Sequence, residues 1–283
     1  MENLPPLVPL PGTAPAGSWR ITDADMADAA GAVAIFAIVI RDGHTLKPLG
    51  TGFYLQPHGG FATAAHVALD AQDRLAADPS SVSIARTFPN GKTRFLPIWK
   101  FFIHDTADVA FGIPAAEFVE DATSQVIRAR VLSVTSTRPP IGAAISTYAY
   151  PLHRFIGDEQ AGGVLHMQPD FYDGRLEEFH PERGPSVKIR PPYYRTSIHL
   201  HGAASGGPVF YDGHVFGIAS SSFEGAEDVA FVTPASALLA IRVPVRIGEG
   251  GGGQTETLGS IAARGQIVTR EVALDPRYRP QVR

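Results

Sequence analysis

The sequence contains no cysteine, which excludes disulfides, cysteine nucleophiles and thiolate metal sites. It also has no long apolar run: the most apolar stretch is 31–40, whereas a helix that crosses a membrane needs about 20 apolar residues. The formal net charge of -4 is small for 283 residues, and no basic stripe points to nucleic acid as a partner. Residues 1–19 lack the basic start and apolar core of a signal peptide. We therefore expect a soluble, cytoplasmic protein without a membrane partner.

What the sequence does contain is a series of short apolar runs separated by turn signals. Hydrophobic residues make up 44% of the chain and charged residues 18%, which is typical of a globular protein with a sizeable core. Asp42-Gly43, Gly59-Gly60, Asn90-Gly91 and Asp212-Gly213 each stand between two such runs. Asn-Gly and Asp-Gly favour β-hairpins because the central residues of a tight hairpin turn need positive φ. No stretch alternates strands with long amphipathic helices, so the sequence predicts a mainly antiparallel β-protein.

Two short helices are expected within this pattern. A turn or two of helix is predicted within Ala64–Leu75, directly after a strand. Near the end of the apolar region, Thr233 is predicted to cap a short helix that runs to Ile241, with Pro234 at its first position.

Three segments do not follow the short-strand pattern. Residues 1–29 are predicted to be a flexible, proline-rich lead-in, and residues 247–283 a glycine linker followed by a polar tail. Residues 152–195 mix Gly and Pro with aromatic and charged residues, with weak strand patterns only at 163–166 and 187–189. We expect this segment to be a large, partly ordered insertion, since loops of such length usually carry function or are disordered.

Three local motifs carry residue types suited to nucleophilic catalysis. They are TAAHV with His66, ADVAF with Asp108, and ASGGPV with Ser205. A serine nucleophile needs a base such as histidine, and a buried carboxylate to orient that base and stabilise its charged form. Taken alone, His66 is equally suited to a core or surface position, Asp105 competes with Asp108, and the glycines after Ser205 also suit a tight turn.

Taken together, the three motifs resemble those of trypsin-like (chymotrypsin-fold) serine peptidases, especially bacterial members without disulfides such as the HtrA-like group. The order His, Asp, Ser separates this family from subtilisin-like enzymes and from α/β-hydrolases. The resemblance implies an all-β fold of two antiparallel six-stranded β-barrels with a short C-terminal helix. The first barrel is expected at 30–123 and the second, with the insertion 152–195, at 124–246.

The resemblance also implies a role for each motif residue. Ser205 would be the nucleophile, His66 the general base and then acid, and Asp108 the orienting carboxylate. No metal or cofactor is required, and the partner is a protein or peptide substrate. The backbone N–H groups of Ala203 and Ser205 would form the oxyanion hole. The expected substrate-binding residues lie close to the nucleophile in the family's fold: His199, His201, Ser220, Ser221 and Ser222.

Two residues before Ser205 depart from the family pattern. Ala203 stands where the family usually has glycine, and a left-handed conformation there costs an alanine about 1–2 kcal/mol unless Gly202 takes up the strain. Ala204 stands where relatives activated by cleavage have the carboxylate that pairs with the new N-terminus, so activation by that route is not expected.

The sequence therefore predicts a serine endopeptidase that works through an acyl-enzyme on Ser205. Two alternatives stay open. One is a protease-fold binding module without catalytic turnover. The other is a protease that a regulatory protein activates through residues 152–195 or the tail.

Overall fold

The computed structural model describes residues 34–42, 45–87, 93–117, 119, 126, 128–158, 162–182, 190–200, 202–222, 229–245 and 254–270. The strands of the first barrel are β1 (Ile35–Asp42), β2 (Thr45–Tyr54), β3 (Phe61–Thr63), β4 (Val82–Thr87), β5 (Thr93–Ile103) and β6 (Ala110–Pro114). Those of the second are β7 (Ala144–Asp158), β8 (Gly162–His180), β9 (Tyr193–Thr196), β10 (Pro208–Tyr211), β11 (His214–Ser222) and β12 (Ala230–Pro234). The remaining elements are the helices α3 (Ala65–Ala77), α4 (Ala235–Ala240) and α5 (Leu258–Ala263), and the strands β13 (Arg242–Val245) and β14 (Gln254–Thr257).

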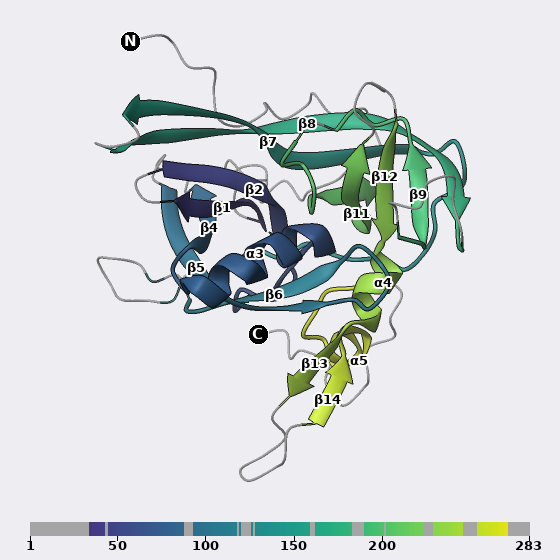
Figure 1. Cartoon of the computed structure of the whole chain (residues 1–283). Coiled ribbons are helices and arrows are strands. Elements are labelled where there is room, and N and C mark those ends of the chain that lie inside the picture. Colours follow the sequence, from purple (N-terminus) through teal and green to yellow (C-terminus); the bar gives the residue numbers. More distant parts are fainter. Residues whose placement is uncertain are drawn as a thin grey trace.

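The strands close into two antiparallel six-stranded barrels that lie side by side (Figure 1). The first has the order β1-β2-β3-β6-β5-β4, and the second has the order β10-β11-β12-β9-β8-β7. This confirms the predicted all-β fold. The exact limits of the predicted domains stay a prediction, and residues 1–29 lie outside the described part of the chain.

The turn signals in the sequence lie where consecutive strands pair. The pairs β1/β2, β2/β3, β4/β5 and β10/β11 are all antiparallel neighbours. In the β10/β11 hairpin, Asp212 and Gly213 both have positive φ, 49° and 77°. Asp-Gly therefore supplies the backbone conformation that the tight turn requires.

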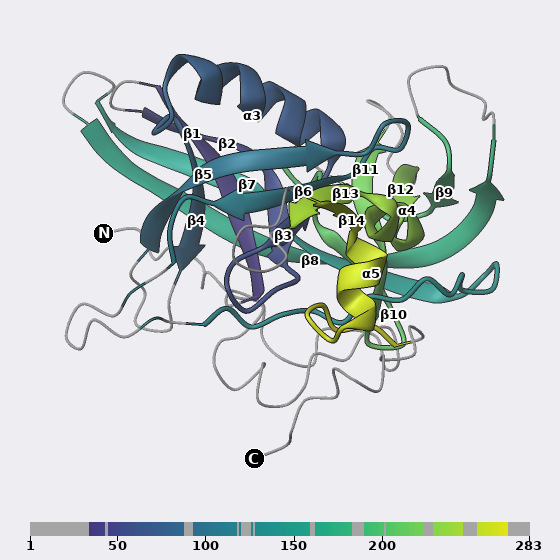
Figure 2. The ribbon, with the colours of Figure 1, turned by 90° about the horizontal axis from the view of Figure 1, so that it is seen from below.

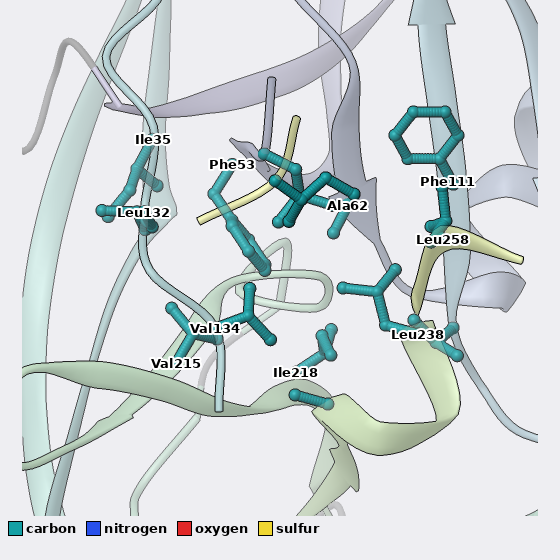
Figure 3. Packing of buried hydrophobic residues seen from close by; sticks show 14 of the residues in the cluster. Ile35, Phe53, Ala62, Phe111, Leu132, Val134, Val215, Ile218, Leu238 and Leu258 are labelled. Carbon is teal, nitrogen blue, oxygen red and sulfur yellow. The ribbon is translucent and has the colours of Figure 1, made fainter. Parts of the chain in front are cut away.

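One hydrophobic cluster spans both barrels (Figure 3). The first barrel contributes Phe53 and Phe111, and the second contributes Val215 and Ile218. Between them lies Val134, whose backbone bridges to Val215 and to Thr269. The barrels therefore share a core, which fixes the position of one relative to the other.

The C-terminal region differs from the predicted linker and polar tail, because residues 254–270 are folded into this core. Leu258, Ile261 and Ala262 lie on one face of α5 and are at most 4% exposed. This one-sided pattern extends over a single short helix among Gly, Thr and Arg residues, so it is weak in the sequence. Residues 246–253 and 271–283 lie outside the described residues.

Residues 152–195 also differ from prediction, because most of them belong to strands of the second barrel. Residues 152–158 end β7, 162–180 form β8, and the two strands pair in antiparallel register. This hairpin runs past the second barrel to contact β1 and β2 (Figure 1). Backbone pairing does not require a regular apolar alternation, which explains why the sequence pattern was weak. The expected strand at 163–166 lies within β8, whereas 187–189 lies outside the described residues.

The two predicted helices are present at the expected positions, but the length of the first and the N-cap of the second differ from the prediction. The helix α3 extends to Ala77, with its buried face on Val67, Ala68 and Ala71 against the first barrel (Figure 2). For α4, Pro234 is the N-cap rather than the first helical residue, and the side chain of Thr233 does not cap the helix. None of the helices in the described ranges is long and apolar enough to cross a membrane.

We expect Leu258→Ala to destabilise the protein by about 2–5 kcal/mol, because it removes a fully buried side chain from the shared core. Val268→Ala, at a position that is 49% exposed, is the matched control and should change the stability by less than about 0.5 kcal/mol. Urea denaturation measures both values. Equal, small effects would show that the C-terminal region does not contribute to the core.

Candidate active site

The carboxylate of Asp108 is the centre of a hydrogen-bond network just before β6. It accepts from the ring Nδ1 of His66 at 2.9 Å, from the backbone N–H of His66 at 2.9 Å, and from the hydroxyl of Ser220. The Asp108 side chain is only 12% exposed. Burial raises the pKa of Asp108, but the hydrogen bond and charge of His66, together with the Ser220 hydrogen bond, lower it overall. The carboxylate is therefore stabilised in its charged form.

His66 owes its position to the start of α3. The first N–H groups of a helix have no intrahelical acceptor, so the N–H of His66 is free to bind Asp108. The His66 side chain is 45% exposed and is held through Nδ1, which leaves Nε2 as the other ring nitrogen. Burial lowers the pKa of His66, but the hydrogen bond and charge of Asp108, helped by Asp70, outweigh it and raise the pKa.

Ser205 lies in the turn that precedes β10, and its hydroxyl faces β11. The hydroxyl donates to the backbone carbonyl of Ser220 at 2.8 Å. No hydrogen bond joins it to His66 within the described residues. Ser220 thus contacts Ser205 with its backbone and Asp108 with its side chain. Through Ser220, all three residues of the predicted triad belong to one hydrogen-bonded cluster.

The turn around Ser205 contains two residues with left-handed backbone. Ala203 has a φ of 64° and Gly206 a φ of 90°, whereas Gly202 has no positive φ. The strain therefore falls on Ala203 itself and not on its neighbour. A Cβ at position 206 would lie 2.1 Å from the carbonyl oxygen of Thr51, so only glycine fits there. The N–H groups of Ala203 and Ser205 have no hydrogen-bond acceptor among the described residues.

The edge of β11 lies beside this turn. The pairing of β10 with β11 ends at Ile218, while Ser221 and Ser222 pair with β12 on the other side. Among the described residues, no strand pairs with the other edge of β11 at Ser221 and Ser222, and a strand edge of this kind is suited to binding an extended peptide. The Ser222 hydroxyl bridges to the carbonyl of Leu200 at 3.0 Å, which links this edge to the segment before Ser205.

The predicted substrate-binding residues occupy different surroundings. The side chain of Ser220 is buried and its hydroxyl donates to Asp108, and a part of this residue in substrate binding stays a prediction. Ser221 and Ser222 lie at the edge, and their part in substrate binding stays a prediction. His199 is half-buried, and His201 lies outside the described residues.

Thr51 contacts the turn of Ser205, and the sequence analysis does not predict this contact. This β2 residue is fully buried and hydrogen-bonds to Ala203 and Ser205 in the other barrel. Its only signal in the sequence is a polar residue between Gly50 and Gly52 within a strand.

Within the described ranges, no group of three or more His, Asp or Glu side chains is arranged to hold a metal ion.

Comparison with known proteins gives a match in structure but not in sequence. No protein-family model matches the chain, and no curated protein matches it significantly. Among solved structures, the active form of the Rv3671c protease from M. tuberculosis is similar, with 18% identity and a TM-score of 0.50 over 83% of this chain and 88% of that one. Deg5 is also similar, at 16% identity and a TM-score of 0.48 over 72% of this chain and 85% of that one. At this identity the likeness shows the fold: that of the trypsin-like serine peptidases.

We expect the pKa of His66 to lie above 6.5, because Asp108 favours the protonated ring more strongly than burial disfavours it. Asp108→Asn should lower this pKa below 6.5, since burial then acts almost alone, and Asp70→Asn should lower it less. An NMR titration of the imidazole proton signals, assigned with His66→Ala, measures the three values. An unchanged midpoint in Asp108→Asn would contradict the observed pairing.

Proposed function

We propose that this chain is a serine endopeptidase that cleaves protein or peptide substrates through an acyl-enzyme on Ser205. The observation that carries the proposal is the hydrogen-bonded cluster of Ser205, Ser220, Asp108 and His66 between two trypsin-like barrels. The name of the structurally similar Rv3671c protease agrees with this activity.

Asp108 gives His66 the tautomer that the reaction needs. Because Nδ1 carries the proton that binds the carboxylate, Nε2 has the free lone pair that can accept the proton of a serine hydroxyl. To give its proton to this nitrogen, the Ser205 hydroxyl must first leave the Ser220 carbonyl.

The reaction then proceeds in two halves. The Ser205 oxygen bonds to the peptide carbonyl carbon while its proton passes to His66, which gives that proton to the leaving amine as the C–N bond breaks. A water molecule next attacks the acyl-enzyme, with His66 as base, and releases the acid and the free serine. Neither half requires a metal or cofactor.

The negative charge that develops on the carbonyl oxygen needs donors. We assign this role to the N–H groups of Ala203 and Ser205, whose lack of other acceptors among the described residues supports it. Losing one such donor costs about 100- to 1000-fold in rate. A substrate strand along the β11 edge would bring its carbonyl carbon to Ser205.

One observation favours an alternative, a binding module without turnover or a protease that a partner must activate. The Ser205 hydroxyl donates to the Ser220 carbonyl instead of to His66. A serine held in this way is not activated by the imidazole, as expected of a protein without turnover or of a protease before its activation. The partner's contact was predicted within 152–195 or the tail. The described residues of these segments belong mainly to β7, β8, β9, β14 and α5, and a partner's contact with either segment stays a proposal.

A fluorophosphonate probe, which reacts with activated serines, separates these functions. We expect the probe to label Ser205 in the wild type. The labelling rate should increase with pH, because His66 must lose its proton to act as a base, and the midpoint of this increase should lie above the ordinary pKa of histidine. Ser205→Ala should abolish labelling, and Asp108→Asn should slow it on the order of 10³- to 10⁴-fold.

Ser80→Ala, in an exposed turn after α3, is the control that should label normally. If the wild type is labelled no more than Ser205→Ala, the proposed enzymatic function is wrong and the binding module is the remaining function. Labelling that begins only after addition of a cell extract would identify the partner-activated form.

A further inference from the structure

Every polar group of Thr51 is hydrogen-bonded, and three of its four hydrogen bonds join the two barrels. Its hydroxyl donates to the Ala203 carbonyl at 2.8 Å and accepts from the Tyr150 N–H at 3.1 Å. Its own N–H donates to the Ser205 carbonyl at 2.8 Å, and its carbonyl accepts from the Thr63 hydroxyl at 2.8 Å. Thr51 is 0% exposed, so water cannot replace these partners.

Two of these contacts act on the turn that carries the nucleophile. They hold the carbonyls of Ala203 and Ser205, one on each side of Ala204. Ala203 is held in the left-handed conformation, which is unfavourable for every L-residue and is readily adopted by glycine. If Ala203 relaxed to a negative φ, its peptide groups would reorient. The Ala203 carbonyl would then leave Thr51, and the Ala203 N–H would leave the position assigned to it in the oxyanion hole.

We propose that Thr51 is a positioning residue that keeps Ala203 left-handed and thereby forms the oxyanion hole. The proposal rests on the proposed peptidase function. Two of the four hydrogen bonds of Thr51 go to the backbone of the turn and none goes to the Ser205 hydroxyl or the His66 imidazole, so Thr51 acts through that backbone. A glycine at position 203 would adopt the left-handed conformation without strain. In this chain the residue is alanine, and a side-chain hydrogen bond from the first barrel stabilises that conformation instead.

Substitution of the hydroxyl tests this role. Thr51→Val removes the hydrogen bonds of the side chain at nearly the same volume, and we expect kcat for a peptide substrate to fall about 10- to 100-fold with KM changed less than about 3-fold. Thr51→Ser retains the hydroxyl and should stay within about 3-fold of wild type. Thr51→Cys, with a weak donor of similar size, should be intermediate and replaces Thr51→Val if the valine variant does not fold.

A peptide aldehyde provides a second measurement, because its adduct with Ser205 places an oxyanion in the hole. Its inhibition constant should rise by the same factor as kcat falls, whereas the affinity for a cleaved peptide product should not change. Thr196→Val is the matched control: it removes another fully buried hydroxyl that donates to a backbone carbonyl, that of Ala230. It should lower the melting temperature without lowering kcat.

Ala203→Gly distinguishes support of the left-handed turn from a general structural role. Glycine adopts this conformation without strain, so Thr51→Val should lower kcat only several-fold or less in the Ala203→Gly background. An equal loss of kcat in both backgrounds, or no rescue by Thr51→Ser, would overturn the proposal. If the wild-type protein fails to react with a fluorophosphonate, the peptidase function falls first and this role with it.

Discussion

The buried charge of Asp108 constrains the whole arrangement. A carboxylate that is largely removed from water must be hydrogen-bonded, and here the donors come from both barrels. His66 belongs to the first barrel and Ser220 to the second, so the charge is satisfied only when the two are docked. The shared apolar core supplies the docking, and the carboxylate makes a wrong alignment costly. Orientation of the imidazole is thus coupled to the global fold.

The turn that carries Ser205 belongs to the second barrel and itself depends on contacts from the first barrel. Its backbone is strained at Ala203 and tightly packed at Gly206, and neither state is stable without a surrounding structure that imposes it. The first barrel provides that structure through Thr51, Thr63 and the backbone near them. Each barrel therefore carries site residues that contacts from the other barrel hold in place: Ser220 of the second barrel binds Asp108, and Thr51 of the first barrel binds the turn of Ser205.

Features encoded by short stretches of sequence were predictable. The Asp-Gly turn at 212–213 and the strand before His66 follow from local backbone preference, and the order of the three motifs indicated the fold. The roles of Ser220 and Thr51 were not predictable, because an isolated serine or threonine in a strand has no pattern that names its distant partner. Residues 152–195 and 254–270 were misread for a related reason. Their strands and helix are stabilised mainly by tertiary contacts, which override weak local patterns.

The placement of α5 in the shared core has a consequence for biosynthesis. A chain emerges from the ribosome N-terminal end first, and both barrels are complete in sequence before residues 254–270 appear. Until then Leu258 and Ile261 are missing from the core that unites the barrels. A nascent chain therefore carries His66, Asp108 and Ser205 before it has the full core that aligns them. The apolar core that unites the two barrels can therefore be completed only after residues 254–270 have been synthesised, so docking of the barrels depends on a segment that follows both of them in the chain.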